Sequence, residues 1–135
     1  MFDKLISSLI IAGVIFGATN VYAEQTQLNS TDYVTTQNVQ NNLTPMKVLE
    51  RLEAGNARFM SGNLLNRDWA AQVARTSQGQ YPAAVILNCM DSRNIPELVF
   101  DQGIGDVFAI RVAGNVVNPD VLGSMEYATQ VVGSK

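Results

Sequence analysis

Three side chains that could take part in chemistry follow a short apolar stretch near the middle of the chain. Residues 83–88 (A-A-V-I-L-N) lead into Cys89, Asp91 and Arg93, which stand at alternate positions. A cysteine thiolate and an aspartate carboxylate are both ligands for zinc. An arginine beside the carboxylate can bind it through two parallel hydrogen bonds. The spacing therefore indicates a candidate metal site at the end of a strand.

The same residues also have ordinary structural interpretations. A free cysteine at the end of a buried strand is most often a small apolar residue, and Asp91-Ser92 is a common turn pair. Tetrahedral zinc needs four ligands, or three and an open position for water, yet Cys89 is the single cysteine and the sequence has no histidine. A reactive thiol of lowered pKa at Cys89 is a third interpretation. The residues alone leave all three open.

The strands that must position these residues follow an α/β pattern. Residues 83–88 are nearly continuously apolar, which is typical of a strand buried on both faces of a parallel sheet, and residues 107–112 predict a second strand. In open α/β sheets, ligands bind beyond the carboxyl ends of the strands. Cys89, Asp91 and Arg93 are therefore expected at the edge of the sheet where ligands bind.

Four helices are predicted around the two strands, with polar caps and prolines at their starts and glycine or turn residues at their ends. The first carries an apolar stripe of Val48, Leu49, Leu52, Phe59 and Met60, and an interruption is expected at Gly55-Asn56. The helices begin at Thr44-Pro45, Asp68, Asn94 (or Ser92) and Asn118-Pro119, and they end near Gly62, Ser77, Phe100 and Gly133.

The N-terminal third has a different composition. Residues 1–23 combine Lys4, an apolar run and a Val-Tyr-Ala end, which predicts a secretory signal peptide and an exported protein, periplasmic or secreted after cleavage. An uncleaved anchor is the alternative. Residues 24–43 are rich in Gln, Asn and Thr without apolar periodicity, which predicts a flexible polar spacer. An arm that holds a partner subunit is the other interpretation of this stretch.

Charge and cysteine content exclude two further classes of protein. The formal net charge is −3 without a basic cluster, which argues against nucleic acid as a partner. A single cysteine cannot form an internal disulfide, so in an exported protein Cys89 is free, paired with another chain or bound to metal.

The motifs around Cys89 closely resemble those of the β-class carbonic anhydrases. The resemblance covers residues 43–133, and its C-x-D-S-R, D-Q-G-x-G-D and A-G-N blocks are highly specific. The matching stretches are E-A-G-N-A-R-F (53–59), C-M-D-S-R (89–93), P-E-L (96–98), F-D-Q-G-I-G-D (100–106), R-V-A-G-N (111–115) and L-G-S-M-E-Y-A (122–128).

The resemblance implies an activity and roles for individual residues. Family members use zinc to hydrate carbon dioxide reversibly to bicarbonate, and they form dimers or larger assemblies. By this resemblance Cys89 is a zinc ligand, and Asp91 either pairs with Arg93 or coordinates zinc in a resting form. Gln102 resembles a residue that orients substrate near the metal.

Three departures from the family pattern limit these expectations. Asn88 and Val112 stand where the family usually has a small or apolar residue and an asparagine, respectively. The family's other two zinc ligands lie in a G-H-x-x-C-G motif that this sequence does not contain.

The expected fold is therefore α/β, a partial β-carbonic anhydrase fold with a parallel sheet core flanked by helices. Its third core strand and everything beyond are missing, so residues 44–135 would be the N-terminal part of the domain. The zinc ligand set is expected to be incomplete and the 135-residue chain inactive alone. An exported, non-enzymatic binding relative of the family is the alternative.

Overall fold

The computed structural model describes residues 31–135, and the predicted signal peptide lies outside them. The described elements are α2 (Gln37–Asn42), α3 (Pro45–Ser61), α4 (Trp69–Thr76), β1 (Ala84–Asn88), α5 (Pro96–Val99), β2 (Val107–Arg111), a 3₁₀ turn η1 (Ala113–Asn115), α6 (Pro119–Glu126) and a π-helical turn η2 (Tyr127–Val131). No helix among these residues is long and apolar enough to cross a membrane.

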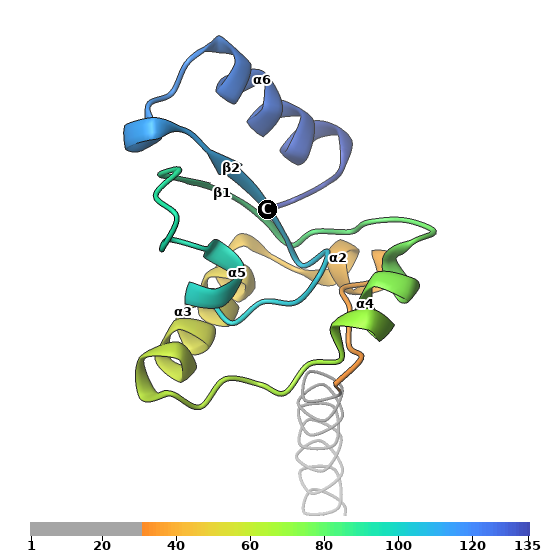
Figure 1. The fold of residues 1–135 in the computed structure, drawn as a ribbon. Helices are drawn as coiled ribbons and strands as arrows, with labels where there is room; N and C mark the ends of the chain where they lie inside the picture. The colour runs from red at the N-terminus through yellow and green to blue at the C-terminus, as the bar shows by residue number, and fades with distance from the viewer. Residues whose placement is uncertain (1–30) are drawn as a thin grey trace, which may run out of the picture. The chain divides into compact units, whose positions relative to one another are not determined.

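The sheet consists of β1 and β2, which run parallel. Their register pairs Ala84 with Val107 at one end and Asn88 with Arg111 at the other. Figure 1 shows α6 on one side of this sheet and α2, α3 and α5 on the other. The predicted α/β class and the parallel pairing are therefore confirmed. The centre of β1 is only half-buried, however, so the expectation of a strand buried on both faces holds at its ends alone.

The core lies between the sheet and α3. Helix α3 begins where the sequence predicts, because the Thr44 side chain accepts a hydrogen bond from the Lys47 N–H and Pro45 follows. It ends at Gly62, whose φ of 73° is a left-handed conformation that glycine adopts without strain. The core consists of Val48, Ala83, Ala84 and Val107, with Leu43, Leu52 and Ile86 packed against them.

Gly55 and Asn56 do not interrupt α3, so this prediction is wrong. Both residues instead contact the C-terminal end of α5, at Val99 and Phe100. A Cβ atom on Gly55 would lie 1.8 Å from the Phe100 carbonyl oxygen, and the Asn56 side chain donates to the Val99 carbonyl at 3.0 Å. Glycine is therefore required here for close approach of two backbones.

Residues 31–43 are part of the fold, so the predicted flexible spacer is corrected over this range. Tyr33, Val34 and Thr35 are buried, and Gln40 in α2 is only 3% exposed. The Gln40 side chain donates to the Pro82 carbonyl at 2.9 Å, just before β1. The composition is misleading because these polar side chains form hydrogen bonds with buried groups instead of water. Residues 24–30 of the predicted spacer lie outside the described range.

Two buried carboxylates hold the loop between α5 and β2. Asp101 pairs with Arg58 of α3 at 2.5 Å and with Arg67 at 3.2 Å. Asp106 pairs with Arg51 of α3 at 2.8 Å. The same Asp106 carboxylate accepts hydrogen bonds from the Thr35 hydroxyl and N–H, at 2.5 and 3.2 Å. This loop is therefore tied both to α3 and to the N-terminal segment 31–35.

The remaining helix caps agree with the sequence in two of three cases. Asp68 accepts from the Ala71 N–H at 2.9 Å, and Asn118 accepts from the Val121 N–H at 2.9 Å. Helix α5 instead begins after Ile95 without a side-chain cap, so neither Asn94 nor Ser92 has the expected capping role. A side-chain cap is less needed here, because Pro96 at the first helical position has no N–H that would need an acceptor.

The segment after α6 returns to the start of β1. The helix changes to a π-helical turn at Tyr127 and ends near Gly133, which has a φ of 89°. The Ser134 hydroxyl then donates to the Pro82 carbonyl at 3.0 Å, and the Lys135 N–H donates to the Ala83 carbonyl at 2.9 Å. The last residues therefore lie beside the beginning of β1.

Candidate metal centre

The loop that follows β1 brings Asp91 and Arg93 together. The Arg93 Nε donates to Asp91 Oδ1 at 3.0 Å and Nη2 donates to Oδ2 at 2.8 Å. The Arg93 backbone N–H also donates to Oδ1 at 3.0 Å. The carboxylate thus binds a guanidinium in the bidentate geometry that is the strongest form of this pair.

This pairing keeps Asp91 ionised. The Arg93 side chain, followed by its backbone N–H and the charge of Arg111, lowers the pKa of Asp91 from 3.8 to about 2. In return, Asp91 raises the pKa of Arg93. A carboxylate with so low a pKa is a poor proton acceptor at neutral pH. Asp91 is therefore suited to orienting neighbouring groups and not to removing protons.

We expect the side-chain carboxyl of Asp91 to titrate near pH 2, well below an ordinary aspartate. Replacing Arg93 with alanine should move this titration up toward 3.8, because the group that favours the ionised form is removed. Carboxyl-carbon NMR shifts recorded against pH measure both values. An Asp91 titration that does not change in Arg93→Ala would contradict the assignment of the shift to this pair.

Cys89 is a free, partly exposed thiol next to this pair. Backbone N–H groups lower the pKa of the thiol, the largest contribution coming from Gly114 and the next from Asp91. Gly114 reaches this position within the 3₁₀ turn after β2, where its φ is 68°. Because the thiolate is the form that binds metal, this environment suits Cys89 as a ligand.

Gln102 is buried in the loop between α5 and β2, with 2% of its surface exposed. Its Nε2 donates to the carbonyl oxygens of Phe100 and Asp101, at 2.6 and 3.2 Å. Its Oε1 is buried and has no hydrogen-bond partner among residues 31–135. The predicted role of Gln102 near the metal therefore stays a prediction, while its hydrogen bonds give it a structural role in the loop after α5.

Arg111 is a contributor to the site that the sequence interpretation did not include. It is the last residue of β2, and its Nη2 donates to the Asp91 carbonyl at 2.6 Å and to the Met90 carbonyl at 3.3 Å. Parallel register puts it opposite Asn88, the residue just before Cys89. The sequence feature that could have identified Arg111 is its position as a charged residue at the carboxyl end of the second predicted strand.

The described residues fit part of a zinc site. Cys89 is a suitable thiolate ligand, and Asp91 can coordinate only if it exchanges its bonds to Arg93. No group of three or more metal-binding side chains occurs within residues 31–135. A zinc site needs three or four protein ligands, so these residues supply at most half of one.

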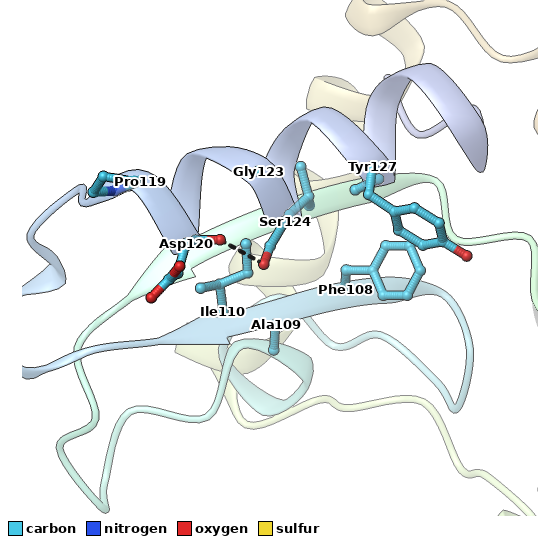
Figure 2. A pocket seen from close by; sticks show the side chains of 10 residues that line it. Phe108, Ala109, Ile110, Pro119, Asp120, Gly123, Ser124 and Tyr127 are labelled. Carbon is cyan, nitrogen blue, oxygen red and sulfur yellow. Dashed lines mark hydrogen bonds between the residues drawn. The ribbon is translucent and has the colours of Figure 1, made fainter.

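A separate hollow lies between α6 and the sheet. It has a volume of about 640 Å³, and Figure 2 shows Phe108 of β2 beside the ring of Tyr127 at one end of it. Small residues line the hollow on the helical side, namely Gly123 and Ser124 of α6 and Ala128 of η2. Cys89 does not line it, so this cavity is not the candidate metal centre.

Comparison with known proteins agrees with the sequence motifs. Residues 84–135 match the family model described as carbonic anhydrase. A carbonic anhydrase of Mycolicibacterium smegmatis is 44% identical over 92 residues, which are 67% of this chain and 45% of the relative. Carbonic anhydrase 2 of Mycobacterium tuberculosis is 42% identical over 92 residues, 67% and 44% of the two chains. The solved structure of the β-carbonic anhydrase CcaA is 29% identical, with a TM-score of 0.46, over 65% of this chain and 45% of that one.

The fold and the site together define an α/β protein with a cysteine–aspartate–arginine loop at the carboxyl edge of a parallel sheet. By its relatives the chain is similar to carbonic anhydrases, and its motifs resemble those of the β class. It spans slightly less than half the length of these two curated relatives.

Proposed function

We propose that this chain contributes to the active site of a zinc-dependent carbonic anhydrase, which hydrates carbon dioxide reversibly to bicarbonate. The observation that carries the proposal is the loop after β1, where a thiol of lowered pKa stands two residues from a carboxylate bound by Arg93. The family relatives support the same reaction. No observation on residues 31–135 favours the alternative of a non-enzymatic binding relative.

Each residue of the loop has a distinct proposed role. Cys89 would hold zinc as a thiolate, and bound zinc supplies a water of lowered pKa as the nucleophile. Arg93 keeps Asp91 ionised and bound at neutral pH, so that its carboxylate is not free to coordinate metal. Asp91 then accepts hydrogen bonds from reacting groups while Arg93 fixes its orientation. Gln102 is proposed to orient substrate, on the resemblance alone.

Zinc binding provides the direct test. We expect the 135-residue chain alone to bind zinc weakly and to hydrate carbon dioxide no faster than free zinc, because its described residues offer two ligands at most. In any longer form of the protein that supplies the remaining zinc ligands, Cys89→Ser should lower zinc affinity by more than about 100-fold, exceeding the loss typical of an outer-shell partner. Metal content after dialysis and stopped-flow carbon dioxide hydration measure these two effects.

Met90→Leu is the matched control for this test, because Met90 is the exposed neighbour of Cys89. It should retain zinc and activity. Stoichiometric, tightly held zinc in the 135-residue chain would refute the expectation of a half site. Full zinc binding by Cys89→Ser in a form that supplies the remaining ligands would refute the role of Cys89.

We further propose that the protein self-associates and is exported. Two of the residues expected in the apolar stripe of α3, Leu49 and Met60, are 47% and 75% exposed, which supports a partner on this helix. Light scattering tests for a dimer or larger assembly.

Export rests on residues 1–23, and N-terminal sequencing of protein isolated from the periplasm tests for cleavage after Ala23.

A further inference from the structure

Asn88, the last residue of β1, is attached to both ends of the loop formed by residues 89–94. Its backbone continues directly into Cys89, while its side-chain Nδ2 donates to the carbonyl of Asn94, six residues further on, at 3.0 Å. The Asn88 residue is 9% exposed. Its own carbonyl accepts from the Val112 N–H at 3.1 Å, which continues the pairing with β2. One residue therefore joins the strand to the start and the end of the loop.

The loop between these two attachments is organised by its own hydrogen bonds. The Asn94 N–H donates to the Asp91 carbonyl at 3.0 Å, which closes a turn, and the Arg93 N–H donates to the Asp91 carboxylate. These bonds fix the shape of the turn but do not attach it to the sheet. The attachment comes from the Asn88 side chain at the end of the loop, from Arg111, which donates to the Asp91 carbonyl, and from the Met90 N–H, which donates to the Val112 carbonyl at 3.3 Å.

The other half of the Asn88 amide shows why asparagine is unusual here. Its Oδ1 is buried and has no hydrogen-bond partner among the described residues. A buried carbonyl without a partner is destabilising, and a small or apolar side chain would avoid that cost. Packing at the end of a strand therefore does not account for asparagine at position 88. The donation from Nδ2 to Asn94 does.

We propose that Asn88 is a positioning residue, which holds the loop of residues 89–94 against the sheet and so fixes the Asp91–Arg93 pair relative to Cys89. The importance of this for catalysis rests on the proposed function. The positioning itself does not, because it concerns the order of the loop in the protein without metal. It predicts that loss of the Nδ2 donor loosens the turn while the rest of the fold remains intact.

The test uses the ¹⁵N-labelled full chain and amide hydrogen exchange by NMR. In Asn88→Ala, the Asn94 N–H should exchange about five- to tenfold faster, the change that corresponds to loss of one hydrogen bond. The Arg93 Nε–H signal should broaden or shift as its pair with Asp91 becomes mobile. Gln40→Ala is the matched control, because it removes another buried amide-to-carbonyl bond, at the opposite end of β1. It should leave both signals of the loop unchanged.

Asn88→Asp adds a variant of nearly the same shape that keeps the acceptors and lacks the donor. It should loosen the turn as Asn88→Ala does. If both variants fail to fold, the unmodified chain provides the test. Its Asn88 side-chain NH₂ protons should be protected from exchange by the hydrogen bond to Asn94. Free exchange of these protons, or unchanged Asn94 and Arg93 signals in a folded Asn88→Ala, would overturn the proposal. These signals are read without metal, so they remain interpretable even if the zinc-binding test of Cys89→Ser refutes the proposed function.

Discussion

Asp106→Asn is expected to destabilise the protein by about 3–5 kcal/mol, the loss typical when one partner of a buried ion pair is removed. The Asp106 side chain is 1% exposed and pairs with Arg51. It also accepts from the Thr35 hydroxyl and N–H and from the Gly103 N–H. Asparagine offers one acceptor oxygen in place of two. It also carries no charge, so it leaves Arg51 without its counter-charge. The loss is a large fraction of the total stability of about 5–15 kcal/mol common for domains.

Urea unfolding followed by circular dichroism measures this effect, with Asp120→Asn as the control on an exposed aspartate. The control should change stability by less than about 0.5 kcal/mol. The dependence of stability on pH gives a second test. Arg51, Thr35 and Gly103 hold the pKa of Asp106 below its ordinary value despite burial. Its contribution is therefore complete above about pH 4 and is lost as pH falls below that. An Asp106→Asn variant as stable as the parent at pH 7 would refute the ion-pair argument.

Gly55→Ala is expected to destabilise the protein by about 3 kcal/mol, at the upper end of the range for overpacking. The new Cβ would lie 1.8 Å from the carbonyl oxygen of Phe100 and 2.7 Å from its carbonyl carbon. Both are backbone atoms, so α3 and the segment after α5 must move apart. That movement also strains the Arg58–Asp101 pair, which joins the same two segments. Thermal unfolding of the purified variant gives the measurement.

Gly123→Ala is the matched control, because it places the same methyl group on another mid-helix glycine. A Cβ on Gly123 meets nothing within 4 Å, and Figure 2 shows this residue facing the hollow between α6 and the sheet. Alanine is a better helix former than glycine by about 1 kcal/mol, so Gly123→Ala should be stabilising. Two glycine-to-alanine changes of the same sign would show that helix propensity, and not the contact with Phe100, governs position 55.

Local patterns in the sequence predicted most of the fold well. Thr44, Asp68 and Asn118 are helix caps as predicted, since a cap depends on residues three positions away. The apolar runs at 83–88 and 107–112 became the two parallel strands. The resemblance to the family, and not periodicity, predicted what the loop after β1 is for.

Apart from the missing side-chain cap of α5, the failures of the sequence interpretation involve partners that are distant along the chain. Gly55 looked like a helix breaker because its neighbour in space, Phe100, is 45 positions away. Residues 31–35 looked like a spacer because Thr35 finds its acceptor only at Asp106. Arg111 was passed over because its role depends on the register between β1 and β2. Polar and glycine residues gave no local sign of these contacts.

The contact between Thr35 and Asp106 spans 71 positions in the chain and therefore bears on the order of folding. Closing so long a loop carries an entropic cost that local helices do not have. During synthesis, which proceeds from the N-terminus, the N–H and hydroxyl of Thr35 lack their carboxylate acceptor until Asp106 has been made. Helix α3 can form long before that, so the hydrogen bonds between Thr35 and Asp106 are expected to form among the last steps.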